Sequence, residues 1–424
     1  MKHLISVSAL ILSAAACSSD PNTNGGSAGA SNTTAGAPGT AGKPGGSAGS
    51  GVAGSPSAGS GGGGTTAGSG NIAGSAPTAG TSSGGTSSGG TSSAGTGPTA
   101  GTSSGGTTSG GTSSGGSGAT ASFKCDNLSL APTATGVAKP SGAAGGLKVI
   151  DWAGFKGAAS FTFDDGRPSQ MDSYAALKAT GARFTWFLIA NSAGSNYKTT
   201  IADGQEIGNH TQSHPDASSN ASLATQAQVT DAQTNLKKTY GVDVHSMAAP
   251  NCLAAWKPYA APAKLFQNRG PCGGGTLAPR DKNVDLLSLP AYMPPENAAA
   301  SVITGQLAMG KWAIFVVHGF VNDNGATYHP VPIANMTAAM SQAVKDGYWP
   351  ETMTNVGAYF QGQMLIPETA TTSATWTLPA NFPPNMCVRI TTTGGTVTQK
   401  GQDIAWDSHG YYQISLDAGE VTVK

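Results

Sequence analysis

Two short polar segments, some forty residues apart, carry the residue types that could do chemistry. Asp164 and Asp165 end an apolar run that starts near Ser160, and His210 and His214 lie four residues apart further along the chain. Adjacent carboxylates repel each other and are costly to desolvate unless a cation compensates them. One carboxylate and two imidazoles can hold a divalent ion, which leaves the second carboxylate to take a proton from water. This combination predicts a metal-assisted hydrolase.

Each motif taken alone also has a structural interpretation. A His-x-x-x-His pair occurs by chance on surface helices, and an Asp-Gly pair favours turns. We expect His210 and His214 to lie on one face of a helical turn, where both can reach one ion. A lone histidine on an apolar strand is more often a core residue. His318 lies just beyond the apolar run 314–317 and precedes Gly319, which shifts the interpretation toward a side chain that faces a site.

Apolar runs alternate with amphipathic stretches over residues 122–363, and this order predicts a parallel sheet with helices outside it, either open or closed into a barrel. In such barrels the chemistry lies where the strands end. The expected strands are 159–163, 183–189, 206–208, 245–248, 285–289 and 312–317, and the expected helices are 170–180, 223–240, 296–309 and 333–346. From residue 368 onward, Thr-rich alternating segments (387–392, 411–416 and 420–423) predict a small all-β appendage.

The N-terminal part has a separate meaning. Lys2 precedes an apolar run and three alanines that end at Cys17, which is typical of an export signal. It resembles a bacterial lipoprotein signal in which Cys17 is lipidated, although Ala14 stands where leucine is usual and free secretion remains the alternative. Residues 18–121 are almost wholly Gly, Ser, Thr and Ala, which predicts a disordered tether.

Charge and cysteine content narrow the classes further. The 22 basic and 22 acidic side chains balance, and no basic run occurs, so we expect no nucleic-acid partner and membrane contact only through a lipid anchor. If Cys17 carries lipid, an even set of cysteines remains for an oxidising compartment, namely Cys125, Cys252, Cys272 and Cys387. Cys252 and Cys272 are expected to form a disulfide near the site, and Cys125 with Cys387 is an open second pairing.

Together these motifs resemble the NodB-homology polysaccharide deacetylases of carbohydrate esterase family 4. The resemblance rests on Thr-Phe-Asp-Asp-Gly at 162–166, His-Thr-Gln-Ser-His at 210–214, and an apolar strand ending in His318. It covers about residues 157–363 and implies a distorted (β/α) barrel.

The family's site residues can be carried over one by one. The resemblance implies that Asp165, His210 and His214 bind the metal, which we expect to be zinc, with cobalt or another divalent ion as alternatives. It implies Asp164 as the general base and His318 as the acid that protonates the leaving group. Two further positions complete the set: the backbone N–H of Asn251 would bind the oxyanion, and Val316 would lie near the acetyl methyl group.

Two departures from the family pattern stand out. The third motif normally supplies an arginine that pairs with the base, but Ala248 to Cys252 contains none, and Arg167 is a candidate substitute. The fourth motif, an Asp-Trp pair that tunes the catalytic histidine, has no clear match, and Asp285 or Tyr292 would be unconvincing replacements.

We therefore expect an exported, lipid-anchored, monomeric enzyme that removes acetyl groups from a polysaccharide or oligosaccharide, with N-acetyl preferred and O-acetyl as an alternative. Its expected parts are a signal peptide (1–17), a linker (18–121), a deacetylase-like catalytic domain (122–366) and a β-rich region (367–424). The main rival is a non-catalytic carbohydrate-binding or surface-interaction protein that keeps the fold. A zinc peptidase is disfavoured, because Thr211 stands where His-Glu-x-x-His requires a glutamate.

Overall fold

The computed structural model describes residues 123–132, 134–321 and 328–424. The predicted signal peptide, Cys17 and the predicted linker lie outside these residues and stay predictions.

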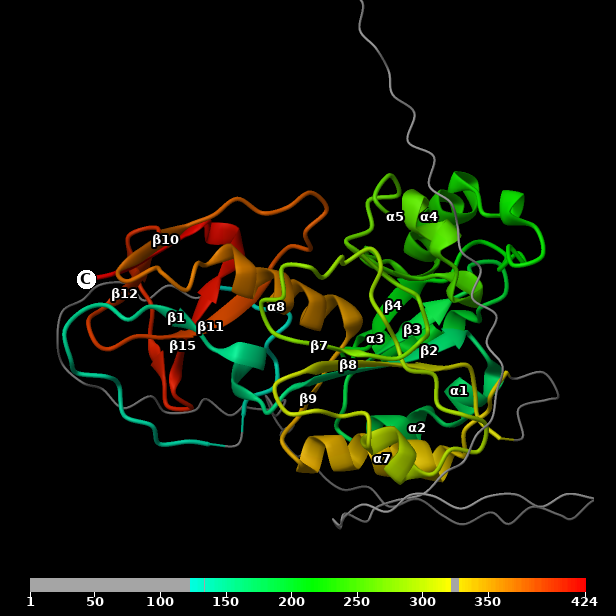
Figure 1. Ribbon diagram of the computed structural model, residues 1–424, viewed down its shortest axis with the longest axis horizontal. Helices are drawn as coiled ribbons and strands as arrows, with labels where there is room; N and C mark the ends of the chain where they lie inside the picture. The colour runs from blue at the N-terminus through cyan, green and yellow to red at the C-terminus, as the bar shows by residue number, and fades with distance from the viewer. Residues whose placement is uncertain (1–122, 133, 322–327) are drawn as a thin grey trace, which may run out of the picture. The chain divides into compact units, whose positions relative to one another are not determined.

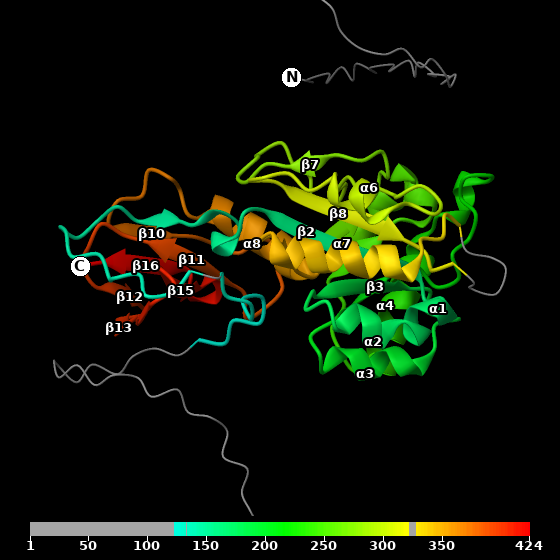
Figure 2. The same ribbon diagram turned by 90° about the horizontal axis from the view of Figure 1, so that it is seen from below.

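A mixed eight-stranded sheet forms the centre of the fold (Figures 1 and 2). Its strands run in the order β6 (Gln267–Arg269), β5 (Ser246–Ala248), β4 (Glu206–Asn209), β3 (Phe184–Leu188), β2 (Ala158–Asp165), β8 (Trp312–Val317) and β7 (Thr276–Leu277), and β9 (Trp349–Pro350) also pairs with β2. All neighbours are parallel except β7, which is antiparallel to β8. In β2 every residue before Asp165 is buried, as expected for a parallel strand covered on both faces.

Single-residue bridges close the sheet into a distorted barrel, as predicted. Leu289 pairs with Arg269 of β6, and Tyr292 pairs with Phe315 of β8. The predicted strand 285–289 is therefore wrong as a regular strand. Its backbone turns between Asp285 and Ser288, where the Ser288 N–H donates to the Asp285 carbonyl. The backbone of the segment meets that of β6 at Leu289 and at the Leu286 carbonyl, which accepts from the Asn268 N–H at 2.8 Å.

Helices pack around the sheet: α1 (Pro168–Asp172), α2 (Tyr174–Lys178), α3 (Lys198–Ile201), α4 (Gln226–Tyr240), α5 (Lys257–Ala260), α6 (Ala300–Thr304), α7 (Ile333–Lys345) and α8 (Met353–Leu365). The predicted helix 170–180 is divided at Ser173 between α1 and α2. The predicted helix 296–309 shrinks to α6, which ends at Thr304 and is followed by Gly305. Helix α8 was missed, because it is buried on nearly all sides and shows no amphipathic period.

Two four-stranded antiparallel sheets form the β-rich region. One has the order β1 (Lys148–Val149), β11 (Cys387–Thr391), β15 (Tyr411–Ser415) and β14 (Trp406–Asp407), and the other β10 (Ser373–Thr375), β16 (Glu420–Val423), β12 (Val397–Gln399) and β13 (Gln402–Asp403). Figure 1 shows β1 in cyan beside the orange and red strands β11 and β15.

The β-rich region is thus built from both ends of the described chain. Besides the β1–β11 pairing, Cys125 is joined to Cys387, and the Asp126 N–H donates to the Asn385 carbonyl at 3.0 Å. The predicted boundary at residue 122 assigned residues up to about 150 to the catalytic domain. These residues form backbone hydrogen bonds with the β-rich region, among them those of Val149 in β1 with Ile390 and of the Ile150 N–H with the Arg389 carbonyl.

Candidate metal centre and active site

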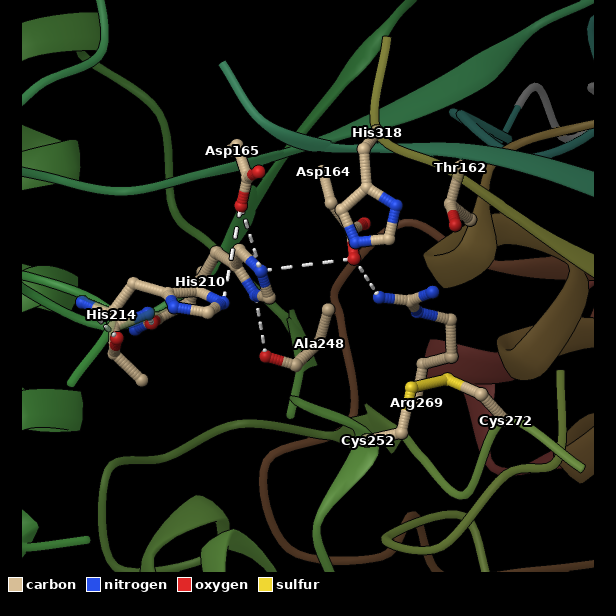
Figure 3. A network of polar contacts seen from close by, with 12 residues as sticks. Thr162, Asp164, Asp165, His210, His214, Ala248, Cys252, Arg269, Cys272 and His318 are labelled. Carbon is tan, nitrogen blue, oxygen red and sulfur yellow. Dashed lines mark hydrogen bonds and ion pairs between the residues drawn. A yellow bond between two sulfur atoms is a disulfide. The ribbon is translucent and has the colours of Figure 1, made fainter. Parts of the chain in front are cut away.

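Four candidate site residues converge at one edge of the barrel, where the parallel strands end (Figure 3). Asp164 and Asp165 are the last residues of β2, and His210 directly follows β4. His318 directly follows β8, whose Val317 pairs with Phe163, so Asp164 and His318 occupy the next positions on neighbouring strands. This is the edge at which barrels of this kind place their chemistry.

Asp165, His210 and His214 form a potential metal-binding trio. One ligand atom from each lies within 4.8 Å of the other two. The Asp165 Oδ1 atom is 3.4 Å from His210 Nε2 and 3.9 Å from His214 Nε2. Two imidazole nitrogens and one carboxylate oxygen match the ligand types of catalytic zinc sites, which keep an open position for water and substrate.

The hydrogen bonding of His210 fits an ion at this place. Its Nδ1 lies 2.9 Å from the Ala248 carbonyl, which can only accept, so Nδ1 carries the proton. In the neutral ring, Nε2 then presents its lone pair toward Asp165 and His214. That Nε2 atom is buried and has no hydrogen-bond partner within the described residues. A divalent ion would satisfy it.

The two histidines meet through a loop, so the predicted helical turn is wrong. Thr211 and His214 both have positive φ angles, of 66° and 51°. Pro215 disfavours helical backbone at His214, and the Thr211 hydroxyl accepts a hydrogen bond from the His214 N–H at 3.0 Å. The loop still holds the two ring centroids 4.7 Å apart.

Arg269 pairs with Asp164, the expected base. It ends β6, its side chain is buried, and its Nη2 donates to Asp164 Oδ2. His210 Nε2 is 3.7 Å from the same oxygen. Asp164 Oδ1 is buried and has no hydrogen-bond partner within the described residues, so it remains available to accept a proton.

The arginine beside Asp164 is therefore Arg269, and the sequence interpretation of Arg167 needs correction. The Arg167 Nε and Nη2 atoms lie 3.2 and 3.1 Å from Asp165 Oδ2, on the oxygen that does not face the histidines. Gly166, with a φ of 76°, turns the chain between the two residues and directs Arg167 to Asp165. Arg269 was missed because it lies 105 residues from Asp164 in the sequence.

A buried glutamine, also missed from the sequence, ties the two strand ends together. Gln170 of α1 donates from Nε2 to the carbonyls of Asp164 and His318, both at 2.6 Å. Its own Oε1 accepts from the Tyr197 hydroxyl at 2.8 Å. Gln170 thus fixes the backbone spacing of the expected base and the expected acid.

A cavity of 570 Å³ lies over the trio. Both aspartates, all three histidines and Asn251 line it, together with Arg167, Ala249, Cys252, Cys272, Met293 and Tyr328. The side chain of Asn251 donates to Asp216 Oδ1 at 2.9 Å. Val316 does not line this cavity: it is 1% exposed and packs in the core with Ile314 on the same face of β8, while Met293 provides an apolar wall.

Burial and charge act in opposite directions on the titrating groups of the site. Burial raises the pKa of Asp165, but the pairing with His210 and the neighbouring imidazole charges outweigh it and hold that pKa well below its usual range. Burial lowers the pKa of His318, although Asp164 and Asp165 act to raise it. The Nδ1 atom of His318 is buried and has no hydrogen-bond partner within the described residues, as expected if the family's tuning carboxylate is absent.

This geometry defines a hydrolase-type metal centre on a distorted α/β barrel. Residues 154–258 match the family model for polysaccharide deacetylase, and this part of the chain is a polysaccharide deacetylase domain. The family predicted from the sequence is confirmed.

A gellan lyase from a Bacillus species is 33% identical over 111 residues. The match covers 25% of this chain and only 4% of that protein's length.

Several solved structures are similar to the chain. The Xyl-CE4 domain of a multidomain xylanase from the hindgut metagenome of Trinervitermes trinervoides is 18% identical, with 51% of this chain and 95% of that chain covered and a TM-score of 0.36. A family 4 carbohydrate esterase from Streptomyces lividans has 16% identity, coverages of 46% and 92%, and a TM-score of 0.33. A family 4 acetyl xylan esterase from Clostridium thermocellum, in complex with a cobalt ion, has 15% identity, coverages of 47% and 89%, and a TM-score of 0.34. At these values the likenesses do not bear on the substrate of this chain.

Two disulfides stabilise the described part of the chain. Cys252 is joined to Cys272 at the wall of the cavity, as predicted, and Cys125 is joined to Cys387. Disulfides persist in oxidising compartments, so this domain works outside the reducing cytosol. Within the described residues, none of the helices has the length and apolar character that a membrane crossing requires.

Proposed function

We propose that this protein hydrolyses acetyl groups on a polysaccharide, with N-acetyl groups preferred and O-acetyl groups as the alternative. The observation that carries the proposal is the placement of the Asp165–His210–His214 trio beside Asp164 and His318 in one cavity. Ligands, base and acid come from three different strand ends and still share that cavity. A structural ion pair would not require this convergence.

The metal ligands in this proposal are Asp165 Oδ1 and the Nε2 atoms of His210 and His214. We infer zinc, with cobalt or another divalent ion as alternatives, because the ligand set is two imidazoles and one carboxylate. When bound, the ion would supply Lewis acidity, polarising the acetyl carbonyl and lowering the pKa of the attacking water.

Asp164 acts as the general base. Arg269 and His210 lie beside its Oδ2 atom, which leaves Oδ1 to accept the proton of the attacking water. The Arg269 guanidinium pairs with this carboxylate and fixes its orientation, and a positioned base typically contributes 10²- to 10⁴-fold to a rate.

His318 acts as the general acid, from the strand next to the base. Attack by water on the acetyl carbon breaks the bond to the sugar nitrogen or oxygen, and the departing atom needs a proton to leave as an amine or alcohol. Tyr328, whose ring centroid is 5.6 Å from that of His318, covers one side of the imidazole. Asn251 lies at the wall of the cavity, where its backbone N–H would stabilise the oxyanion.

The test measures acetate release from N-acetylated chitin oligomers, peptidoglycan and acetylated xylan, with zinc and after chelation. Asp164→Asn should lose activity by at least a hundredfold and still bind zinc, whereas His210→Ala should lose zinc binding. Asp243→Asn removes an exposed carboxylate that pairs with Lys237, and should behave like the unaltered protein.

Zinc binding without acetate release from any of these substrates would contradict the proposal. It would favour the rival, a carbohydrate-binding protein that retains the fold. That rival rested on two missing family contacts, and Arg269 now supplies a counterpart for one of them. The isolated Nδ1 of His318 is its remaining support.

We also propose that the protein is exported as a monomer and held to a membrane by lipid on Cys17. The support is the signal-like N-terminal sequence and the even set of cysteines left after Cys17, which the two disulfides use completely. Metabolic labelling with a fatty-acid analogue, lost in Cys17→Ser, tests the lipid.

A further inference from the structure

A second cavity adjoins the first across Arg167. It has a volume of 490 Å³, and the two cavities share Asp165 and Arg167 as wall residues. Exposed Ser192 and Asn196, on the segment before α3, supply neutral polar groups to its lining. Both volumes fall in the range of ligand-binding clefts. A glycan whose acetylated unit lies at the trio can therefore place a neighbouring sugar in the second cavity.

Arg167 is held at its backbone and partly exposed at its side chain. Its carbonyl lies 2.9 Å from the Tyr197 hydroxyl, whose single proton is shared between this carbonyl and Gln170 Oε1, and Pro168 begins α1 directly after it. The side chain is 33% exposed. A guanidinium carries five N–H donors, and the contacts with Asp165 Oδ2 involve only Nε and Nη2. Donors remain for a ligand in either cavity.

The charges around the two cavities favour an anion at this position. Among the described residues that line them, Arg167 is the one lysine or arginine. The carboxylates of the lining are Asp164, which Arg269 neutralises, and Asp165, which would share its charge with the metal ion. With the ion in place, the positive charge of Arg167 is no longer balanced by Asp165.

We propose that Arg167 binds a carboxylate of the substrate, on the sugar next to the unit that loses its acetyl group, and so selects acidic acetylated glycans. This inference rests on the proposed function and adds a substrate class to it. Two sources supply such a carboxylate, a uronic acid and a lactyl ether on an amino sugar, and a guanidinium would bind both in the same bidentate way.

The experiment compares kcat/KM for acidic and neutral acetylated oligosaccharides of equal length, using the zinc-loaded full chain. One acidic substrate carries a uronic acid and another a lactyl ether. In Arg167→Gln the ratio of acidic to neutral kcat/KM should fall about tenfold, the scale of one charge-assisted hydrogen bond. Arg167→Lys should retain part of the preference. Lys198→Gln, which removes an exposed cation that lines neither cavity, should leave the ratio unchanged.

The ratio separates substrate binding from a purely structural role. If Arg167 only holds Asp165 in place, its loss will lower kcat/KM equally for both kinds of substrate, and the inference is overturned. Calorimetric binding of acidic and neutral oligosaccharides that lack acetyl groups gives a readout independent of hydrolysis. Tighter binding of the acidic one, lost in Arg167→Gln, would support the inference even if no acetate were released. Equal binding of both would contradict it.

Discussion

Two buried arginines, one at the catalytic edge of the barrel and one in the β-rich region, are both 1% exposed but have different partners. Arg269 pairs with the Asp164 carboxylate and lies over the Phe187 ring at 5.2 Å. Its Nε and Nη1 atoms have no hydrogen-bond partner within the described residues. Arg389 instead donates to backbone carbonyls, those of Ala153, Leu130 and Leu128, at 2.8, 2.6 and 3.4 Å.

The different partners indicate that Arg269 belongs to the candidate active site and that Arg389 has a structural role. The carbonyls around Arg389 are uncharged and fixed by the backbone, so this arginine joins segments 128–130 and 153 to β11. The partner of Arg269 is a titratable group at the end of a strand, next to a trio of metal-ligand types. Arg389 Nε also has no hydrogen-bond partner within the described residues, so the two arginines differ in the kind of partner they have and not in the presence of unsatisfied donors. We therefore expect the two arginines to differ in what their removal affects.

The largest effect is expected for Arg269→Met. The variant leaves Asp164 buried without its cation, which should cost about 3–5 kcal/mol of unfolding free energy. The base also loses its orientation, so kcat should fall by on the order of a hundredfold or more. Urea denaturation and acetate release measure the two effects.

A double variant guards against simple misfolding. Arg269→Met combined with Asp164→Asn removes both charges, so much of the lost stability should return while activity stays absent. Full activity in the single variant would contradict the assigned role of Arg269.

The second prediction concerns Arg389→Met, which should affect stability alone. Two buried carbonyls and one partly buried carbonyl lose a donor, and the expected loss is about 3 kcal/mol of unfolding free energy. The kcat/KM value should remain within about twofold at a temperature where the variant is folded. If Arg389→Met lowered kcat strongly and left the unfolding midpoint unchanged, Arg389 would not have the purely structural role that distinguishes it from Arg269.

The third prediction concerns Glu351, a buried acid that, unlike Asp164, has no cation in close contact. Glu351 is buried, the nearest Arg183 nitrogen lies 3.9 Å from its Oε2, and burial raises its pKa to about 7 despite the charge of Arg183. Because this folded-state pKa exceeds the ordinary value of 4.5, its stabilising contribution is complete below pH 4.5 and is lost as the pH rises through about 7.

Glu351→Gln should therefore unfold like the unaltered protein at pH 4.5 and be more stable by about 3 kcal/mol at pH 8. Thermal unfolding at the two pH values measures the difference. A variant that is less stable at pH 8 would mean that Glu351 is ionised and well paired at that pH.

The sequence predicted the strands that form apolar runs, because parallel strands covered on both faces are apolar throughout. Strand β6 was missed, since its residues Gln267, Asn268 and Arg269 are polar although all three are buried. Because β6 was not recognised as a strand, Arg269 was not considered as the partner of Asp164, and Arg167 was proposed instead. Two residues that pair across 105 positions of sequence leave no local pattern that could identify them.

The sequence predicted which residue types form the candidate site and that they lie where strands end, but it did not predict their local geometry. The motifs around Asp165 and His210 placed the metal-ligand types, and the family match covers both. The loop conformation at His214 and the bridging role of Gln170 depend on positive φ angles and tertiary hydrogen bonds, which neither propensity nor spacing reveals.

The bond between Cys125 and Cys387 has a mechanical consequence. A pull applied to the chain from its N-terminal side enters the described structure at residue 123 and reaches this covalent link two residues later. The load then passes into β11, and the strand ends that carry Asp164, His210 and His318 lie off its route. A load applied between residue 123 and the C-terminal end would thus bypass residues 126–386, the part of the chain that contains these three side chains.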